Sequence, residues 1–531
     1  MPATQQVTKG FENENTVWRL KQENRLDEFH KRYDDALAKC RRELGKAYTL
    51  IIAGERVNTK NSFDDTNPSN TKEVIGRFAS ATPEDTQKGI KAAAAAFPKW
   101  SSLDYKERIK ILRKAAELMR QRKYEFAAWM TLENGKPRIE SMNDVDEAVD
   151  FLAYYPYLYE KSDGFHTTMF KPFPNEDCHS YLKPTGPWAV IAPFNFPVAI
   201  TVGMTVGCIL TGNTCVLKPA SDTPLVAYKF VELLEDAGVP DGVVNFVTGS
   251  GGAVGQTLLD NPAVRGVVFT GSRDVGMKVI ESGHRFARPS IIEMGGKNPI
   301  LVTAKADLDK AVEGVGRSAF GFSGQKCSAA SRVYVDKKLY ADFTKRLVAW
   351  TEANCKVGNP ELKDTFMGPV ISTKAHDQYL DFVEKAKKGG RILLGGKSAS
   401  SGGLANGHFV EPTIVEGLPD DHWVTCNELF VPIVSLYSVD GLEQAVRRAN
   451  NVEYGLTAGI FSEDPKEVQY FFDNVEAGVC YANRRIGGST GAIVGGQSFG
   501  GWKHSSSTAR GAGGPWYLQQ FCREQSQTRA S

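Results

Sequence analysis

The sequence predicts an α/β protein made of two α/β domains with a cleft between them. From Pro187 onward, short β-rich apolar runs alternate with amphipathic helical patterns, which is typical of a parallel sheet covered by helices. A second block of the same kind runs from Asn298 to about Ala482. The chain has 531 residues, 41% of them hydrophobic, which is enough to bury two or three cores. Because ligands bind such sheets at the carboxyl ends of strands, we expect the functional residues there.

Helical patterns precede the first alternating block. Lys21–Lys46 is charge-rich, with apolar residues near helical spacing, and predicts one amphipathic helix lying on the body of the protein. Three or four more helices are expected between Thr82 and Tyr159, including Asp85–Trp100 and Tyr105–Arg122. We interpret them as a helical layer.

The first alternating block contains four expected strands and two expected helices. The strands are Trp188–Ala192, Thr214–Leu217, Val243–Val247 and Val264–Thr270, and the helices are Pro224–Gly238 and Asp274–Gly283. Near the C-terminus, the glycine- and serine-rich segment Ile486–Gly514 contains or adjoins several aromatic residues. A disordered linker rarely keeps such residues, so we expect an ordered loop shaped by its glycines.

Charge and cysteine content exclude several classes of protein. Lys+Arg is 64 and Asp+Glu is 62, so a net charge of +2 gives no field that would gather nucleic acid or an anionic membrane. Apolar stretches such as Val198–Leu210 are too short to span a bilayer. Glu12 and Glu14, without an apolar h-region, argue against a targeting peptide, so we expect a cytoplasmic protein. The scattered cysteines contain no Cys-x-x-Cys pair, which disfavours disulfides and a metal site.

One cysteine, Cys327, differs from the others in its setting. It follows Gly324-Gln325-Lys326 in a small polar loop whose backbone can present a thiol to a cleft. A free cysteine is most often a small buried hydrophobic residue, and this explanation would hold for Cys327 alone. Three further motifs favour a nucleophile instead.

These motifs each follow a predicted strand. Asn195 comes after Trp188–Ala192, where its amide can donate to a developing oxyanion, although alone it would be explained as a turn residue. Glu293 precedes a glycine pair, and a partly buried carboxylate with a raised pKa suits a general base that activates water. The third motif, Phe269-Thr270-Gly271-Ser272, precedes a helix whose first N–H groups can hold a pyrophosphate, a weak signal by itself.

Together the motifs resemble the aldehyde dehydrogenase superfamily, over nearly the whole chain after about residue 50. They also occur in that family's order. The segments that carry the resemblance are Pro193–Pro197, Lys218-Pro219-Ala220, Phe269–Ser272, Glu293-Met294-Gly295-Gly296, Gly324–Cys327 and Asn427-Glu428-Leu429-Phe430-Val431-Pro432.

The resemblance implies an aldehyde dehydrogenase-like fold, with a Rossmann-like cofactor domain facing a catalytic domain, and it implies a mechanism. Cys327 as thiolate attacks the aldehyde, and the Asn195 amide and the main-chain N–H of Cys327 hold the oxyanion. After hydride transfer to a nicotinamide, Glu293 activates the water that hydrolyses the thioester. The expected product is a free carboxylic acid.

The resemblance also implies NAD as cofactor. The residues that it assigns to cofactor binding are Lys218, Ser221, Gly271, Ser272, Glu428 and Phe430. Lys218 corresponds to the adenosine ribose contact, Ser272 to the pyrophosphate contact and Glu428 to the nicotinamide ribose contact, with Phe430 close to the nicotinamide. At Ser221, many members that prefer NAD carry a glutamate that would repel a 2′-phosphate. NADP therefore stays open as a second cofactor.

Subfamily features indicate a substrate with a distant carboxylate. Asn483–Arg485, Gly495–Gly501 and Ala512–Leu518 resemble the matching region of the 1-pyrroline-5-carboxylate dehydrogenases, as does the long N-terminal extension. The implied substrate is glutamate γ-semialdehyde. Hydroxyl groups and backbone N–H groups can bind its α-carboxylate. The residues expected to bind it are Ser328, Gly513 and Gly514 for the carboxylate, and Phe196 and Phe499 for the methylenes.

The sequence departs from the subfamily pattern in two places. Ser498 stands where proline is usual, and His504–Thr508 reads His-Ser-Ser-Ser-Thr where Ser-Gly-Thr is expected. The second departure is consistent with a loop one residue longer. It leaves open whether Gly513 or Gly514 contacts the carboxylate.

The expected division of the chain has five parts. They are an N-terminal extension with the first part of the cofactor-binding domain (1–162), an oligomerisation hairpin (163–186), the second part of the NAD(P)-binding domain (187–297), a catalytic domain (298–486), and a substrate-anchor loop with a C-terminal oligomerisation segment (487–531). By resemblance, the hairpin pairs with a partner subunit, and the segment around Trp516–Arg523 takes part. A homodimer or higher homo-oligomer follows.

Three alternatives remain open from the sequence. The chain could oxidise another semialdehyde or an aliphatic aldehyde, it could pass its acyl group to coenzyme A, or it could be a non-catalytic binding or structural protein of the same fold. The last is disfavoured because Asn195, Glu293, Cys327 and Glu428 are all present.

Overall fold

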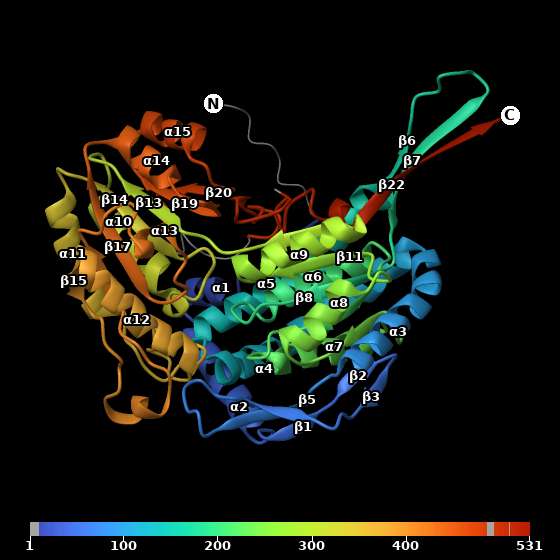
Figure 1. The fold of residues 1–531 in the computed structure, drawn as a ribbon, viewed down its shortest axis with the longest axis horizontal. Helices are drawn as coiled ribbons and strands as arrows, with labels where there is room; N and C mark the ends of the chain where they lie inside the picture. The colour runs from blue at the N-terminus through green and yellow to red at the C-terminus, as the bar shows by residue number, and fades with distance from the viewer. Residues whose placement is uncertain (1–9, 486–492, 509) are drawn as a thin grey trace.

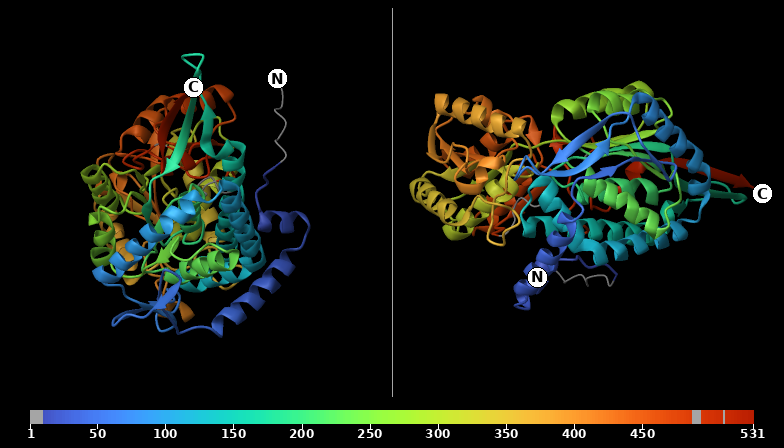
Figure 2. Two further views of the ribbon diagram at one scale, coloured as in Figure 1. Left: turned by 90° about the vertical axis from the view of Figure 1, so that its right-hand side faces the viewer. Right: turned by 90° about the horizontal axis from the view of Figure 1, so that it is seen from below.

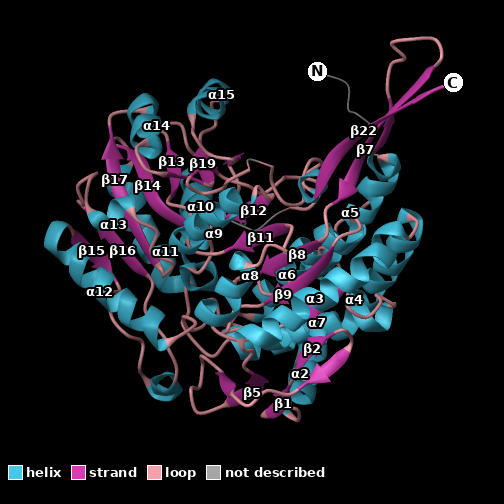
Figure 3. Ribbon diagram, turned by 45° about the vertical axis from the view of Figure 1, so that its right-hand side comes forward, coloured by secondary structure: helices cyan, strands magenta, loops and turns pink. Residues whose placement is uncertain are grey.

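Two seven-stranded sheets form the two halves of the molecule and confirm the predicted α/β fold (Figure 1). The computed structural model describes residues 10–485, 493–508 and 510–531. Helices lie over the faces of both sheets (Figure 3). Among the helices in these ranges, none combines the length and the apolar character that crossing a membrane requires.

The sheet of the half that precedes residue 298, where the cofactor is expected and which we call the cofactor half, has the strand order β12-β11-β8-β9-β10-β2-β3. Its strands are β2 (Leu50–Ile52), β3 (Glu55–Val57), β8 (Pro187–Ile191), β9 (Thr214–Lys218), β10 (Val244–Phe246), β11 (Gly266–Thr270) and β12 (Ser290–Glu293). Strands β8 to β12 are parallel, as expected, and β2 and β3 add an antiparallel edge. The chain passes from β8 to β9 and β10 on one side and then returns to β11 and β12 on the other. The topological switch point, where ligands bind, therefore lies between β8 and β11.

Helices cover this sheet as the alternating pattern predicted. They are α3 (Pro83–Ser102), α4 (Tyr105–Asn134), α5 (Arg138–Lys161), α6 (Ala199–Leu210), α7 (Pro224–Ala237), the short α8 (Gln256–Asp260) and α9 (Arg273–Phe286). Thr82 and Asp85 form a capping box that starts α3, with Pro83 in its first turn. The helix expected over Tyr105–Arg122 continues to Asn134, because its later residues are buried, and ends at Gly135 with φ 73°.

The N-terminal extension is two helices and not the single helix expected over residues 21–46. They are α1 (Thr16–Gln22) and α2 (Leu26–Arg41). Asn24 between them adopts φ 56°, a left-handed conformation that breaks the helix. Phe29 and Tyr33 of α2 are fully buried, and the Tyr33 hydroxyl donates to the Ala127 carbonyl of α4 at 2.8 Å. The extension is thus part of the main core. After α2, β1 (Lys46–Tyr48), β4 (Ser62–Thr66) and β5 (Val74–Ala79) form a small sheet.

The sheet of the other half, which contains the predicted nucleophile Cys327 and which we call the catalytic half, has the order β15-β16-β17-β14-β13-β19-β20 and confirms the second alternating block. Its strands are β13 (Asn298–Val302), β14 (Ala330–Asp336), β15 (Arg391–Leu394), β16 (Thr413–Glu416), β17 (Ile433–Val439), β19 (Thr457–Phe461) and β20 (Val479–Ala482). Its helices are α10 (Leu308–Phe320), α11 (Tyr340–Asn354), α12 (Thr373–Gly389), α13 (Trp423–Cys426), α14 (Leu442–Asn450) and α15 (Pro465–Asn474). All strand pairs except β15 with β16 are parallel.

A three-stranded ribbon projects from the cofactor half (Figures 1 and 2). Its strands are β6 (His166–Thr168), β7 (Glu176–Pro184) and β22 (Cys522–Ala530), in the order β22-β7-β6. β22 pairs with β7 along its whole length, and every residue of β22 after Cys522 is exposed. The C-terminal chain therefore joins the hairpin that the sequence predicted.

The glycine-rich segment expected to be an ordered loop lies only partly within the described residues, because 486–492 and 509 fall outside them. In the remainder, Ile493 bridges to Gln497 and Phe499 bridges to Ala512. β21 (Trp502–Lys503) pairs with β18 (Tyr454–Gly455) of the catalytic half. These described parts are held by main-chain hydrogen bonds.

Candidate active site

A cavity lies where strand ends of the cofactor sheet meet the loop before β14. It is lined by Glu147, Phe151, Phe196, Ile200, Gly203, Met204, Thr270, Glu293, Met294, Cys327, Phe499, Ala512 and Tyr517. Four of the predicted site residues, Cys327, Glu293, Phe196 and Phe499, thus share one cavity. Asn195, Ser328, Gly513 and Gly514 do not line it, although Phe196 and Ala512, their neighbours in sequence, do.

Cys327 lies between α10 and β14, after a tight turn. In that turn, Phe322 and Ser323 have φ values of 48° and 55°, a left-handed conformation that costs energy and is found at functional sites. The side chain of Asn298 donates to the Cys327 carbonyl at 2.7 Å and so ties the turn to β13. Burial, reinforced by nearby carboxylates, raises the pKa of the Cys327 thiol, whereas the Ser328 N–H opposes this. Attack by this sulfur therefore requires that the thiol first lose its proton.

Glu293 is the last residue of β12 and is 9% exposed. Burial raises the pKa of its carboxyl to about 8. The Ser506 hydroxyl donates to Glu293 Oε1 at 2.8 Å. This bond and the nearby Gly501 N–H both lower the pKa of the carboxyl, but burial has the larger effect. A carboxylate whose pKa lies near neutral suits a general base.

Asn195 is buried in the loop between β8 and α6, at the switch point of the sheet. Its carbonyl accepts a hydrogen bond from Lys136 Nζ at 2.6 Å. Lys136 also pairs with Asp144 at 2.6 Å, and Asp144 accepts the Ala199 N–H at 2.7 Å. This fully buried ion pair fixes both ends of the Asn195 loop. Sequence reasoning missed Lys136 because lysine is normally a surface residue.

The residues predicted to bind the adenosine and pyrophosphate lie at or just after the ends of β9 and β11. Lys218 ends β9 and is buried, which lowers the pKa of its amine to about 8, and its Nζ donates to the Pro219 carbonyl at 3.0 Å. Ser221 is exposed in the following turn. After β11, Gly271 leads into Ser272, the N-cap residue of α9, whose side chain makes no capping bond. The first N–H groups of α9 are therefore not capped and suit an anion.

Glu428 lies against the segment that follows Glu293. Its Oε1 accepts the Gly296 N–H at 3.0 Å, and burial raises the pKa of its carboxyl to about 7. At Gly295, a Cβ atom would lie 2.0 Å from Glu428 Oε2, so only glycine permits this approach. Phe430 has φ 59°, and its ring meets that of Phe194 edge-on at 5.7 Å. A buried lysine, an uncapped helix start and a carboxylate along one sheet edge fit a dinucleotide.

The predicted carboxylate donors are already used inside the described structure. The Gly513 N–H donates to the Tyr155 hydroxyl at 3.0 Å, and the Gly514 N–H donates to the Gly511 carbonyl at 3.2 Å. Ser328 is buried directly after Cys327. A carboxylate that uses the Gly513 N–H must therefore displace the Tyr155 hydroxyl or share the N–H with it.

Sequence reasoning also missed Glu147 of α5, which lines the cavity together with Cys327 and Glu293. The available signal was its spacing from Asp144, since residues three apart on a helix lie on the same face. Asp144 itself pairs with Lys136, so Glu147 alone of the two lines the cavity.

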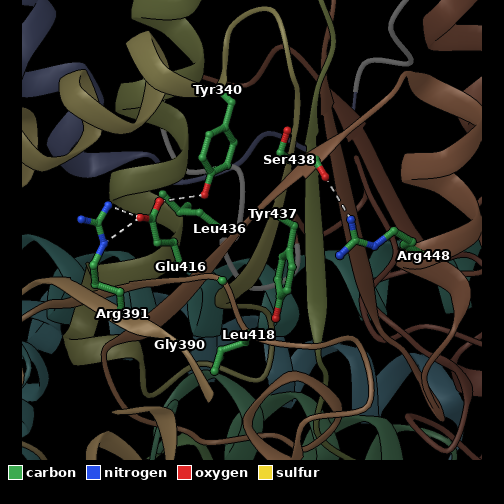
Figure 4. A pocket seen from close by; sticks show the side chains of 10 residues that line it. Tyr340, Gly390, Arg391, Glu416, Leu418, Leu436, Tyr437, Ser438 and Arg448 are labelled. Carbon is green, nitrogen blue, oxygen red and sulfur yellow. Dashed lines mark hydrogen bonds and ion pairs between the residues drawn. The ribbon is translucent and has the colours of Figure 1, made fainter. Parts of the chain in front are cut away.

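A second pocket lies on the catalytic half, away from these residues (Figure 4). Glu416 there accepts hydrogen bonds from Arg391 at 2.9 Å and from the Tyr340 hydroxyl at 3.0 Å. Arg448 donates to the Ser438 carbonyl at 3.1 Å. None of the predicted site residues lines this pocket, and these charged groups have partners.

Known proteins similar to this chain carry closely related names. The Aldehyde dehydrogenase family model matches residues 56–526. The chain is 41% identical over 494 residues to 1-pyrroline-5-carboxylate dehydrogenase 1 of Halalkalibacterium halodurans, covering 92% of this chain and 94% of the relative. It is 42% identical over 495 residues to 1-pyrroline-5-carboxylate dehydrogenase of a Geobacillus species, with the same coverage. The crystal structure of 1-pyrroline-5-carboxylate dehydrogenase from Thermus with bound NAD matches with TM-score 0.91 and 36% identity, over 100% of both chains. This chain belongs to the aldehyde dehydrogenase family.

Proposed function

We propose that this protein is an NAD-dependent dehydrogenase that oxidises glutamate γ-semialdehyde, the open form of 1-pyrroline-5-carboxylate, to glutamate. The observation that carries the proposal is that Cys327 and Glu293, from opposite halves of the molecule, line one cavity. A nucleophile and a base in the same cavity are what formation and hydrolysis of a thioester require. The names of the relatives support the choice of substrate.

The first chemical step is attack by the Cys327 thiolate, whose proton has passed to solvent, on the aldehyde carbon. The resulting oxyanion is stabilised by the Asn195 amide and the Cys327 main-chain N–H. Lys136 and Asp144 hold the Asn195 loop in place before the substrate arrives. Such preorganised donors are effective because they need not reorient during the reaction.

NAD, when bound, would supply the acceptor for the hydride that leaves the tetrahedral centre. We assign Lys218 and Ser221 to the adenosine ribose side, Gly271, Ser272 and the start of α9 to the pyrophosphate, and Glu428 and Phe430 to the nicotinamide ribose side. The absence of a glutamate at Ser221 is consistent with some use of NADP. Glu293 then takes a proton from water, whose oxygen attacks the thioester and releases Cys327.

The substrate's two α-substituents need partners of opposite charge. Phe196 and Phe499 supply apolar walls for the methylenes, and Glu147 supplies a carboxylate that suits the α-ammonium. For the α-carboxylate we assign Ser328 and the turn at Gly513 and Gly514. If the Gly513 N–H no longer donated to the Tyr155 hydroxyl, it could donate to the α-carboxylate of the substrate.

The ribbon of β6, β7 and β22 supports a homo-oligomer. A three-stranded ribbon with exposed faces buries little apolar surface alone, so a partner subunit would stabilise it. We propose that 163–186 and the C-terminal part of 487–531 form this contact. The cofactor domain would consist of 1–162 and 187–297, and the catalytic domain of 298–486.

The test is a panel of aldehydes assayed with NAD and with NADP. We expect NADH formation to be most efficient, in kcat/KM, with glutamate γ-semialdehyde, and we expect Cys327→Ala to abolish it. Better turnover of succinic semialdehyde or a short aliphatic aldehyde would refute the substrate. A strict requirement for coenzyme A would refute hydrolysis, and no turnover of any aldehyde would favour a non-catalytic role.

A further inference from the structure

Three consecutive serines, Ser505–Ser507, run antiparallel to the end of β12, the strand that carries Glu293. The Met294 N–H donates to the Ser505 carbonyl at 2.8 Å, and the Ser507 N–H donates to the Ile292 carbonyl at 3.0 Å. Glu293 and Ser506 form the bridge between these two bonds. The serines lie in the segment that departs from the expected Ser-Gly-Thr pattern.

The three hydroxyl groups have different partners. Ser505 Oγ donates to the Gly295 carbonyl at 2.7 Å, and Ser507 Oγ donates to the Ser290 carbonyl at 2.9 Å. These two side chains hold main-chain atoms at either end of the pairing. Ser506 alone among them directs its hydroxyl to a titratable group, donating to Glu293 Oε1 at 2.8 Å.

A second contact of the Ser506 hydroxyl is compatible with its donating to Glu293. The Thr508 N–H donates to Ser506 Oγ at 3.3 Å, which occupies one lone pair of the oxygen and leaves the hydroxyl proton available for Glu293. Glu293 Oε2 is buried and accepts no hydrogen bond from any residue in the described ranges, and the Gly501 N–H, which also lowers the pKa of the carboxyl, forms no hydrogen bond to Oε2. One carboxylate oxygen is therefore held, and the other is left for a proton.

We propose that Ser506 is a positioning residue that holds Glu293 Oε1, so that Oε2 receives the proton of the hydrolytic water. This inference rests on the proposed role of Glu293 as general base. In the step concerned, the water oxygen bonds to the thioester carbon, its proton passes to Oε2, and the C–S bond breaks with the electron pair returning to Cys327. Ser506 donates throughout and keeps its own proton.

The experiment compares Ser506→Ala, Ser506→Thr and Ser507→Ala with the wild type, using glutamate γ-semialdehyde and NAD. Rapid mixing measures the burst of NADH from hydride transfer, and steady-state assays measure kcat against pH. For Ser506→Ala we expect an unchanged burst of NADH and a kcat about tenfold lower. We also expect the acid limb of the profile of kcat against pH to lie about one pH unit higher, because the Glu293 carboxylate loses a donor that favours its charged form. Ser506→Thr keeps the hydroxyl and should restore the profile.

Ser507→Ala is the matched control, because it removes a neighbouring hydroxyl that does not touch Glu293. A purely structural role would lower thermal stability in both alanine variants and leave both pH profiles unchanged, which would overturn the proposal. An unchanged kcat in Ser506→Ala, while Glu293→Gln loses turnover, would also overturn it and leave the proposed function intact. Full turnover in Glu293→Gln would refute both.

Discussion

The pH dependence of stability in Glu293→Gln is the sharpest physical prediction of this site. Glu293 has a pKa raised by burial from 4.5 to about 8. The folded protein therefore binds this proton more tightly than the unfolded chain, and the contribution of Glu293 to stability falls as pH rises from about 4.5 to about 8. With these two values, linkage gives a cost of about 1 kcal/mol at pH 5 and about 3 kcal/mol at pH 7.

Glutamine has nearly the same shape and no charge, so Glu293→Gln should remove this cost. We expect the variant to melt at a higher temperature than the wild type at pH 7, with a smaller gain at pH 5. Thermal unfolding of both proteins between pH 5 and pH 8 measures the difference. The control is Glu352→Gln on α11, where the side chain is exposed and no such trend is expected. An equal difference in melting temperature at pH 5 and pH 7 would refute the assigned burial cost.

Three further predictions follow from contacts around the site. Lys136→Met leaves Asp144 buried without its partner, so the free energy of unfolding should fall by about 3 kcal/mol or more and kcat should fall too. Lys99→Met, on the surface, should change neither quantity. Chemical denaturation and steady-state kinetics measure both, and wild-type stability in Lys136→Met would count against the role of the pair. Gly295→Ala forces Glu428 to move, so KM for NAD should rise about tenfold. Gly252→Ala, where a Cβ meets nothing within 4 Å, should leave KM for NAD unchanged. Equal KM values in the two variants would contradict the role of Glu428 in binding NAD. Truncation after Arg523 removes most of β22, so light scattering should show a smaller assembly, and an unchanged mass would disprove the assigned contact.

Much of the fold was predictable because it rests on local patterns. The parallel strands of the first block were expected within two residues of β8, β9, β10 and β11, since buried strands read as continuous apolar runs. The extent of α4 and the break at Asn24 were not predicted. They depend on tertiary burial and on one left-handed residue, neither of which a periodic pattern reveals.

The site was predictable where residues follow strands and less so where they come from elsewhere. Cys327 and Glu293 were expected together, and the structure places both in one cavity. Lys136 reaches the site from the loop between α4 and α5, Glu147 from α5, and Ser506 from a loop distant in sequence. Lys136 and Ser506 depend on packing between elements, so no local signal marked them, whereas the spacing of Glu147 from Asp144 was a signal in the sequence.

The most direct test of the central claim is to trap the acyl group in Glu293→Gln. After the variant is mixed with glutamate γ-semialdehyde and NAD, we expect one burst of NADH and, by mass spectrometry of peptides, a glutamyl thioester on Cys327 that persists because its hydrolysis is slow. A modification on another cysteine, or a burst without any acyl group on Cys327, would contradict the assignment of nucleophile and base.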